Sequence, residues 1–175
     1  METALTALII IAIVLFGLVT LAHGYLAAQD SIQEAWQAME ARASQRARTR
    51  LSAITAIVLD TGATIEITLR NDGSERLADL ARWDVVLQYS APSGPVARWY
   101  PYTGMPEPSV NQWTTRGIYL DAAKAIPEAY DPQILNPGEE MVIRIRVSPP
   151  VADATTSLAT IATVNGVSTS LSFSK

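Results

Sequence analysis

The sequence predicts an α+β protein, in which one long N-terminal α-helix is followed by an antiparallel β-sandwich with immunoglobulin-like packing. Three observations predict this class. Residues 3–22 are apolar and carry no charge, which suits a helix in lipid or in a helical bundle. Apolar residues then recur every three or four positions as far as residue 52, and beyond it short alternating runs are separated by Gly and Pro turns. We therefore expect a helix at 1–52 and a sandwich at 53–175.

The apolar segment 3–22 has the length of a membrane span. A helix of about 20 residues rises about 30 Å, which matches the hydrocarbon thickness of a bilayer. A helix that is apolar on all sides must be covered by lipid or by similar helices. In the second case, we expect the chain to pack against copies of itself through Leu8, Ile9, Ile11, Ile13, Val14, Leu15, Phe16, Gly17, Leu18 and Leu21.

A cleaved secretory signal is one alternative, and a plain single-pass membrane anchor is another. A signal peptide has a basic start and a small-residue cleavage site, whereas Met1-Glu2 is not basic and the helical pattern continues past Ala22. The nearest basic cluster lies at residues 42–50, on the C-terminal side, and the positive-inside rule alone would keep that side in the cytoplasm. We therefore expect that a short basic leader preceded Met1 and was removed by a peptidase.

Residues 25–52 form the amphipathic part of the expected helix. One side carries small and apolar residues, and the other carries acidic residues followed by arginines. The arginine group has two interpretations, a solvated helix end or a contact with acidic groups on a neighbouring subunit. It comprises Arg42, Arg46, Arg48 and Arg50.

The sandwich is expected to hold about eight strands. Ile65, Ile67 and Leu69 alternate with polar residues, so we expect them to face the core while the polar residues face water. Asn165-Gly166 is the strongest hairpin signal in the chain. The strands are expected at 54–60, 64–70, 83–89, 96–102, 112–120, 141–147, 158–164 and 167–173.

Composition argues against an enzyme and against a nucleic-acid partner. The chain has no cysteine, a single histidine, His23, and a net charge of −4. A nucleophile–base pair or a zinc site would have to be built without thiolates or a second imidazole. We therefore expect no catalytic residue, no cofactor and no metal. Calcium at the loop residues Asp121 and Asp131 is the one alternative, and no EF-hand-like spacing supports it.

Aromatic residues gather in the middle of the chain. Such side chains serve as core, as contacts between subunits or as platforms for sugars. All three roles remain open for Trp99, Tyr100, Tyr102 and Trp113.

Short motifs make the chain resemble the type IV pilin superfamily, and its all-β head resembles the archaellin branch. Residues 1–4 followed by an Ile and Leu run look like a chain cut just before its apolar segment, and Leu5 stands where bacterial pilins have glutamate. Residues 69–74 leading to 83–86, together with Asn136-Pro137-Gly138-Glu139, are similar to sandwich motifs of archaellins and of their stator relatives.

The resemblance implies a structural subunit of an archaellum-like motility filament, a helical homopolymer on the outside of the cell. The precursor would sit in the cytoplasmic membrane, lose its leader to a class III signal peptidase and be assembled by an ATPase platform. A membrane-anchored stator or adaptor that contacts the cell envelope is the alternative within the superfamily. A membrane-tethered sugar-binding module that uses Trp99 and Tyr102 is an alternative from another class.

Overall fold

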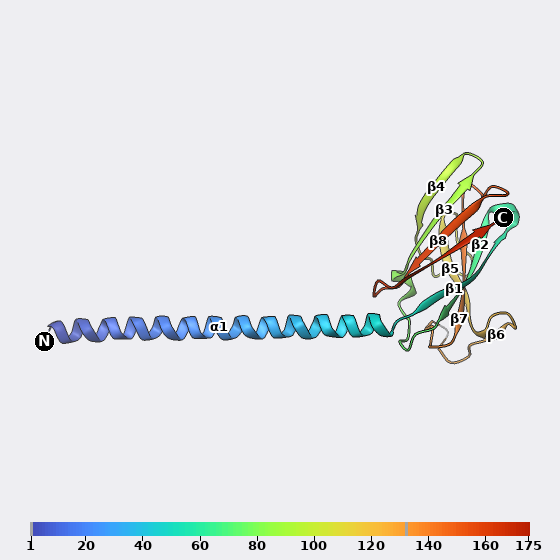
Figure 1. The fold of residues 1–175 in the computed structure, drawn as a ribbon. Helices are drawn as coiled ribbons and strands as arrows, with labels where there is room; N and C mark the ends of the chain where they lie inside the picture. The colour runs from blue at the N-terminus through green and yellow to red at the C-terminus, as the bar shows by residue number, and fades with distance from the viewer. Residues whose placement is uncertain (1, 132) are drawn as a thin grey trace. The chain divides into compact units, whose positions relative to one another are not determined.

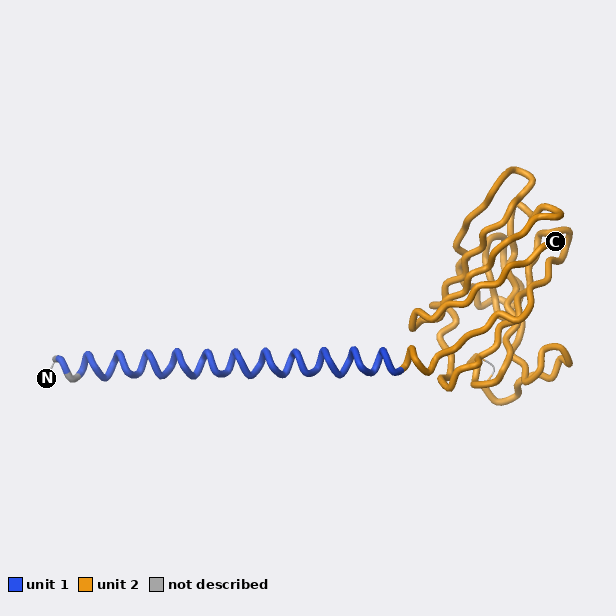
Figure 2. The backbone as a smooth tube through the Cα atoms, viewed as in Figure 1, with its two compact units in different colours: residues 1–44 blue, residues 45–175 orange. Residues whose placement is uncertain are grey.

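The computed structural model describes residues 2–131 and 133–175. The chain divides into two compact units, residues 1–44 and residues 45–175 (Figure 2). Helix α1 (Glu2–Arg48) supplies all of the described first unit and the start of the second, and the described residues of the second unit form nine strands. Figure 1 shows the helix and the strands. Met1, next to which the leader is expected to be cut, lies outside the described residues.

The helix ends at Arg48, four residues before the predicted end. Leu51, which the helical pattern included, starts strand β1 (Leu51–Leu59) and pairs with Asn71 of strand β2 (Thr64–Asn71). Residues 51–53 thus pair with β2 in a sheet. The helical periodicity of the sequence could not show this, because it depends only on neighbouring residues, whereas strand pairing depends on a distant partner. The boundary at 52 is therefore wrong.

Two antiparallel sheets form the second unit, which confirms the predicted α+β sandwich. The five-stranded sheet has the order β1-β2-β7-β5-β6, and the four-stranded sheet has the order β4-β3-β8-β9. The remaining strands are β3 (Asp84–Ala91), β4 (Gly94–Tyr100), β5 (Gln112–Asp121), β6 (Ile126–Pro127), β7 (Glu140–Arg146), β8 (Thr156–Ala162) and β9 (Ser168–Ser174). All the predicted strands are present with shifted ends, and only the two-residue β6 was not predicted.

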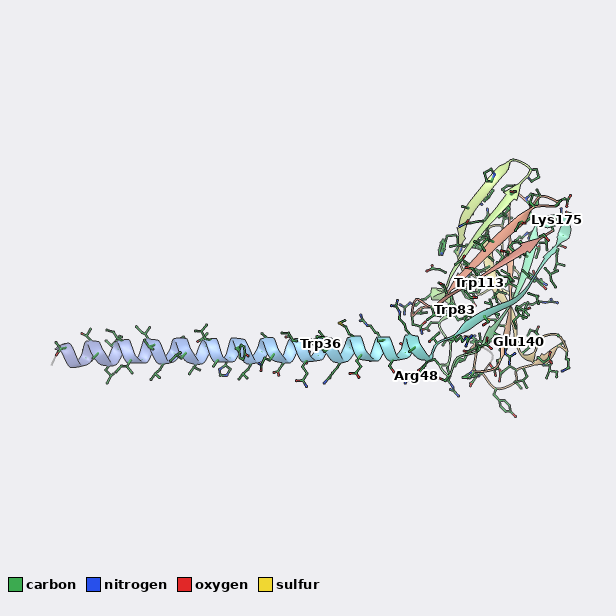
Figure 3. The ribbon with its side chains drawn as sticks, in the orientation of Figure 1. Trp36, Arg48, Trp83, Trp113, Glu140 and Lys175 are labelled. Atoms are coloured by element: carbon green, nitrogen blue, oxygen red, sulfur yellow. The ribbon has the colours of Figure 1, made fainter. Side chains whose placement is uncertain are left out.

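The core lies between the sheets. Ile65, Ile67 and Leu69 are fully buried, as their alternation predicts, and Trp83 and Trp113 are the largest buried side chains. Figure 3 marks both tryptophans within the sandwich. The prediction that the polar residues of β2 face water is wrong for Glu66, because arginine side chains cover it and leave it 9% exposed.

Candidate functional site

The first candidate site is the surface of the apolar helix. Every described side chain of residues 3–44 is exposed, and Figure 3 shows side chains projecting above and below α1. Among the predicted packing residues, the exposed fraction runs from 50% at Ile9 to 76% at Phe16. Covering a large apolar side chain is worth about 1.5–3 kcal/mol. The helix is also long and apolar enough to cross a membrane, so it requires either lipid or other helices around it.

The same surface has a gap where a neighbouring helix could approach. Apart from its chain neighbours and the nearby backbone of its own helix, a Cβ atom built on Gly17 would meet no described atom within 4 Å. Small residues of this kind allow helix backbones to come close together in an apolar environment.

The apolar stripe continues into the amphipathic part of α1. Tyr25, Ile32 and Trp36 are between 58% and 69% exposed, and with Ala28 they line a shallow groove on the helix. Figure 3 labels Trp36 on this part of the helix. Trp36 therefore offers a large aromatic surface, because 69% of the residue is exposed among the described residues.

The second candidate site joins the last helical turn to the sandwich, within residues 45–175. The backbone N–H of Ser74 donates to the carbonyl of Arg48 at 2.9 Å, and the N–H of Asp72 donates to the carbonyl of Arg50 at 2.9 Å. Carbonyls at a helix end need such partners. A Cβ at Gly73 would lie 2.5 Å from the Arg48 carbonyl oxygen, so only glycine fits this close approach.

Asn71 connects the two turn motifs that the sequence analysis singled out. Its side chain is fully buried, and its Nδ2 donates to the carbonyls of Glu75 at 2.7 Å and Leu135 at 2.9 Å. Its backbone N–H donates to Glu139, and its carbonyl accepts from Gly138. The Asn-Asp-Gly and Asn-Pro-Gly-Glu turns are thus one structural unit. The sequence could not reveal it, because Leu135 lies 64 positions after Asn71 in the chain.

Two arginines of the predicted basic group are tied to the sandwich of the same chain. Arg46 Nε donates to the carbonyl of Asn165 at 2.7 Å. Arg48 forms an ion pair with Glu75, with Nη2 2.5 Å from Oε1. Both side chains are nevertheless exposed, and Arg48 is 57% exposed, so the interpretation as a solvated helix end holds, with the addition that these arginines contact the sandwich of their own chain.

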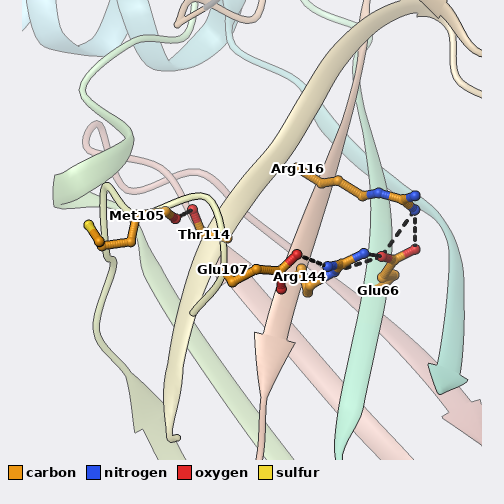
Figure 4. Close-up of polar contacts among 6 residues, drawn as sticks. All are labelled: Glu66, Met105, Glu107, Thr114, Arg116 and Arg144. Carbon is orange, nitrogen blue, oxygen red and sulfur yellow. Dashed lines mark hydrogen bonds and ion pairs between the residues drawn. The ribbon is translucent and has the colours of Figure 1, made fainter. Parts of the chain in front are cut away.

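A charged cluster covers the outer face of the five-stranded sheet (Figure 4). Glu66 on β2 accepts hydrogen bonds from Arg116 at 2.9 Å and from Arg144 Nε at 2.9 Å. Arg144 also pairs with Glu107, on the segment between β4 and β5. These carboxylates, Glu107 first and then Glu66, raise the pKa of Arg144. The cluster holds the segment that carries Glu107 against the sheet.

Replacing Glu66 with glutamine should weaken the sandwich. The amide would present N–H donors to two arginines that need acceptors, so we expect the free energy of unfolding to fall by about 1–3 kcal/mol. Denaturant unfolding of the detergent-solubilised chain, followed by tryptophan fluorescence, measures the change. Asp153→Asn is the control, because its carboxylate is 84% exposed in its pair with Lys175 and its loss should cost about 0.5 kcal/mol or less. Equal losses in both variants would contradict a structural role for the cluster.

The residues considered for calcium are not arranged as a site. Asp121 is already paired with Lys124, with Oδ2 2.7 Å from Nζ, and this hydrogen bond lowers the pKa of Asp121. Across residues 2–131 and 133–175, no group of three or more His, Cys, Asp or Glu residues could hold a metal ion.

The four aromatic candidates separate into different environments. Tyr100 and Trp113 are fully buried, and burial raises the pKa of the Tyr100 hydroxyl. Tyr102 is half-buried and meets Trp113 edge to face, with ring centroids 4.8 Å apart. Trp99 is 53% exposed. Contact roles for Tyr100 and Trp113 are therefore wrong, because inward-facing strand positions place both rings in the core, and Trp99 alone keeps a largely free surface.

No protein-family model matches the chain, and no curated protein matches its sequence. Solved structures of archaellum proteins do share its fold. The periplasmic stator complex of FlaF and FlaG from Sulfolobus acidocaldarius is 22% identical, with a TM-score of 0.51 over 71% of this chain and 89% of that chain. FlaG alone, from the same organism, is 21% identical, with a TM-score of 0.50 over 71% of this chain and 99% of that chain.

The archaeal flagellum of Methanospirillum hungatei strain JF1 is a third similar structure. It is 17% identical, with a TM-score of 0.50 over 99% of this chain and 90% of that chain. Such coverage includes the long helix as well as the sandwich. The fold resemblance to archaellum proteins is thereby confirmed.

Proposed function

We propose that this chain is the structural subunit of an archaellum-like filament. In this role the apolar helices of many copies form the filament core and the sandwiches form its outer wall, outside the cell. One observation carries the proposal: the helical segment 3–22 is apolar around its whole circumference, and its described side chains are exposed. The likeness to the archaeal flagellum over 99% of the chain supports it.

The energetics favour a permanent polymer once the helix has left the membrane. Exchanging lipid for helix contacts brings little hydrophobic gain, so close packing must favour assembly. Returning one subunit to water would expose at least nine large apolar side chains of residues 8–21, each at a cost of about 1.5–3 kcal/mol. Before assembly, the membrane, a class III signal peptidase and an assembly ATPase would be its partners.

A second candidate is a membrane-anchored stator that contacts the cell envelope. The fold likeness to FlaF and FlaG of the periplasmic stator favours it. The two roles require different properties of the helix. A stator anchored by its helix requires only an apolar surface that is stable in lipid. A filament subunit also requires a surface that packs closely against other helices.

Gly17→Leu should separate these roles. Leucine keeps the segment apolar, so membrane insertion should remain normal, but its side chain fills the gap at Gly17 and should lower the yield of sheared filaments at least about tenfold. Leu18→Ile is the matched control, because it adds no volume, and it should assemble normally. Filament yield is measured by shearing cells and immunoblotting the released polymer. Absence of this chain from the sheared polymer of the wild type and of both variants would favour the anchored stator. Normal yield with Gly17→Leu would contradict close helix packing at Gly17.

A further inference from the structure

We propose that the outer face of the four-stranded sheet binds a neutral carbohydrate, with Trp99 as its stacking platform. We define this face by the outward-pointing residues of β4, β3, β8 and β9. This inference goes beyond the filament role, because it concerns a surface of the sandwich and requires no assembly step.

Trp99 is held in one orientation with its ring accessible. Its Nε1–H donates to the Asp84 carboxylate at 2.9 Å, while 53% of the residue stays exposed. Trp99 stands opposite Val86 in the pairing of β4 with β3, and Asp84 lies two residues before Val86 on the same face of β3. A fixed, exposed indole presents an apolar surface at little cost in conformational entropy when a ligand binds.

A shallow groove lies on the same sheet. It has a volume of about 620 Å³ and its lining includes Gln88, Ser90, Ala97, Leu158 and Ser172. Gln88 pairs with Ala97 on one side and with Leu158 on the other, and Leu158 pairs with Ser172. Ala97 precedes Trp99 by two residues and shares its face of β4. The groove therefore supplies an amide and two hydroxyls on the strands that also carry the aromatic platform.

The charge of this face selects the class of ligand. Asp84 is its one charged residue among the described outward positions of the four strands, and that carboxylate already accepts the indole N–H. The other polar groups are hydroxyls and amides, such as the Thr160 and Ser170 hydroxyls that lie 2.9 Å apart. An uncharged, polyhydroxylated ligand with one apolar face complements this surface. None of these described outward positions holds a lysine or arginine that could bind an acidic ligand.

Trp99→Ala should abolish binding to a neutral polysaccharide. The experiment incubates the detergent-solubilised full chain with insoluble cellulose, insoluble mannan and calcium alginate beads, and it measures the protein that sediments. We expect retention on a neutral polysaccharide and not on alginate, with affinity at least about tenfold weaker for Trp99→Ala. Asp84→Ala keeps the ring but frees it, so its affinity should be intermediate. Tyr130→Ala removes an aromatic side chain that is 92% exposed elsewhere and should bind normally.

Three results would overturn the carbohydrate site. They are no retention of the wild type on either neutral polysaccharide, retention on alginate alone, and equal retention of Trp99→Ala and wild type. Filament yield is measured on the same variants, so that failure of the carbohydrate site is distinguished from failure of the filament role. If Trp99→Ala loses filaments and keeps its polysaccharide binding, the face is a contact between copies of the chain, and the inference is wrong.

Discussion

Replacing Ile11 with aspartate should abolish filaments and leave a folded sandwich. Ile11 lies in the middle of the apolar segment and is 59% exposed on the isolated helix. A carboxylate at the centre of an apolar environment costs about 2.5–3.5 kcal/mol on insertion scales, and every copy in a helical polymer would bear this cost. Electron microscopy of sheared material measures the filaments, and protease digestion of intact cells measures the exported sandwich.

The matched control for this prediction is Ile11→Leu. It keeps the apolar character and the volume of the side chain, so its filament yield should stay close to that of the wild type. A chain that is merely anchored in the membrane makes no filaments in any variant. Intact filaments of the Ile11→Asp variant would show that residue 11 is not enclosed by other helices, against the proposed function.

Replacing Asn71 with leucine should strongly destabilise the sandwich. Its side chain is fully buried and makes three hydrogen bonds, two as donor and one as acceptor from the Gly73 N–H at 3.0 Å. Leucine has a similar volume and none of these groups, so buried backbone groups would lose their partners. We expect the free energy of unfolding to fall by about 3 kcal/mol or more. Denaturant unfolding of the full chain in detergent, followed by tryptophan fluorescence, measures it.

The neighbouring Asp72 provides the control for Asn71. Its side chain is 34% exposed and forms one ion pair with Arg70 at 3.3 Å, so Asp72→Ala should cost about 1 kcal/mol or less. If the Asn71 variant were as stable as the Asp72 variant, the two turn motifs would not form the unit described above. A loss confined to the Asn71 variant supports that unit.

Local patterns predicted the fold class and most of the strands. The alternation of Ile65, Ile67 and Leu69 sufficed to place them in the core, because a strand that is buried on one face must follow a period of two. The long apolar run likewise predicted the helix. Both signals are contained within a few consecutive residues, so no knowledge of distant contacts was needed.

Features that depend on distant partners could not be predicted. The helix ends at Arg48 because Leu51 pairs with Asn71, and Glu66 is buried because Arg116 and Arg144 cover it. The aromatic cluster in the sequence separated into core and surface for the same reason, since the direction of each ring depends on strand register. The sequence does hold a weak signal for the charged cluster around Glu66. One strand pattern carries an acidic residue among its outward positions, and other strand patterns carry arginines at theirs.

The most direct test is electron cryo-microscopy of filaments sheared from cells, with the subunit identified by mass spectrometry. The proposed function predicts a polymer of this chain whose central density is a bundle of α-helices, with residues 3–22 in contact only with other copies and the sandwiches outside. Filaments that lack this chain, with the protein recovered solely from detergent extracts of membranes as single copies, would contradict it.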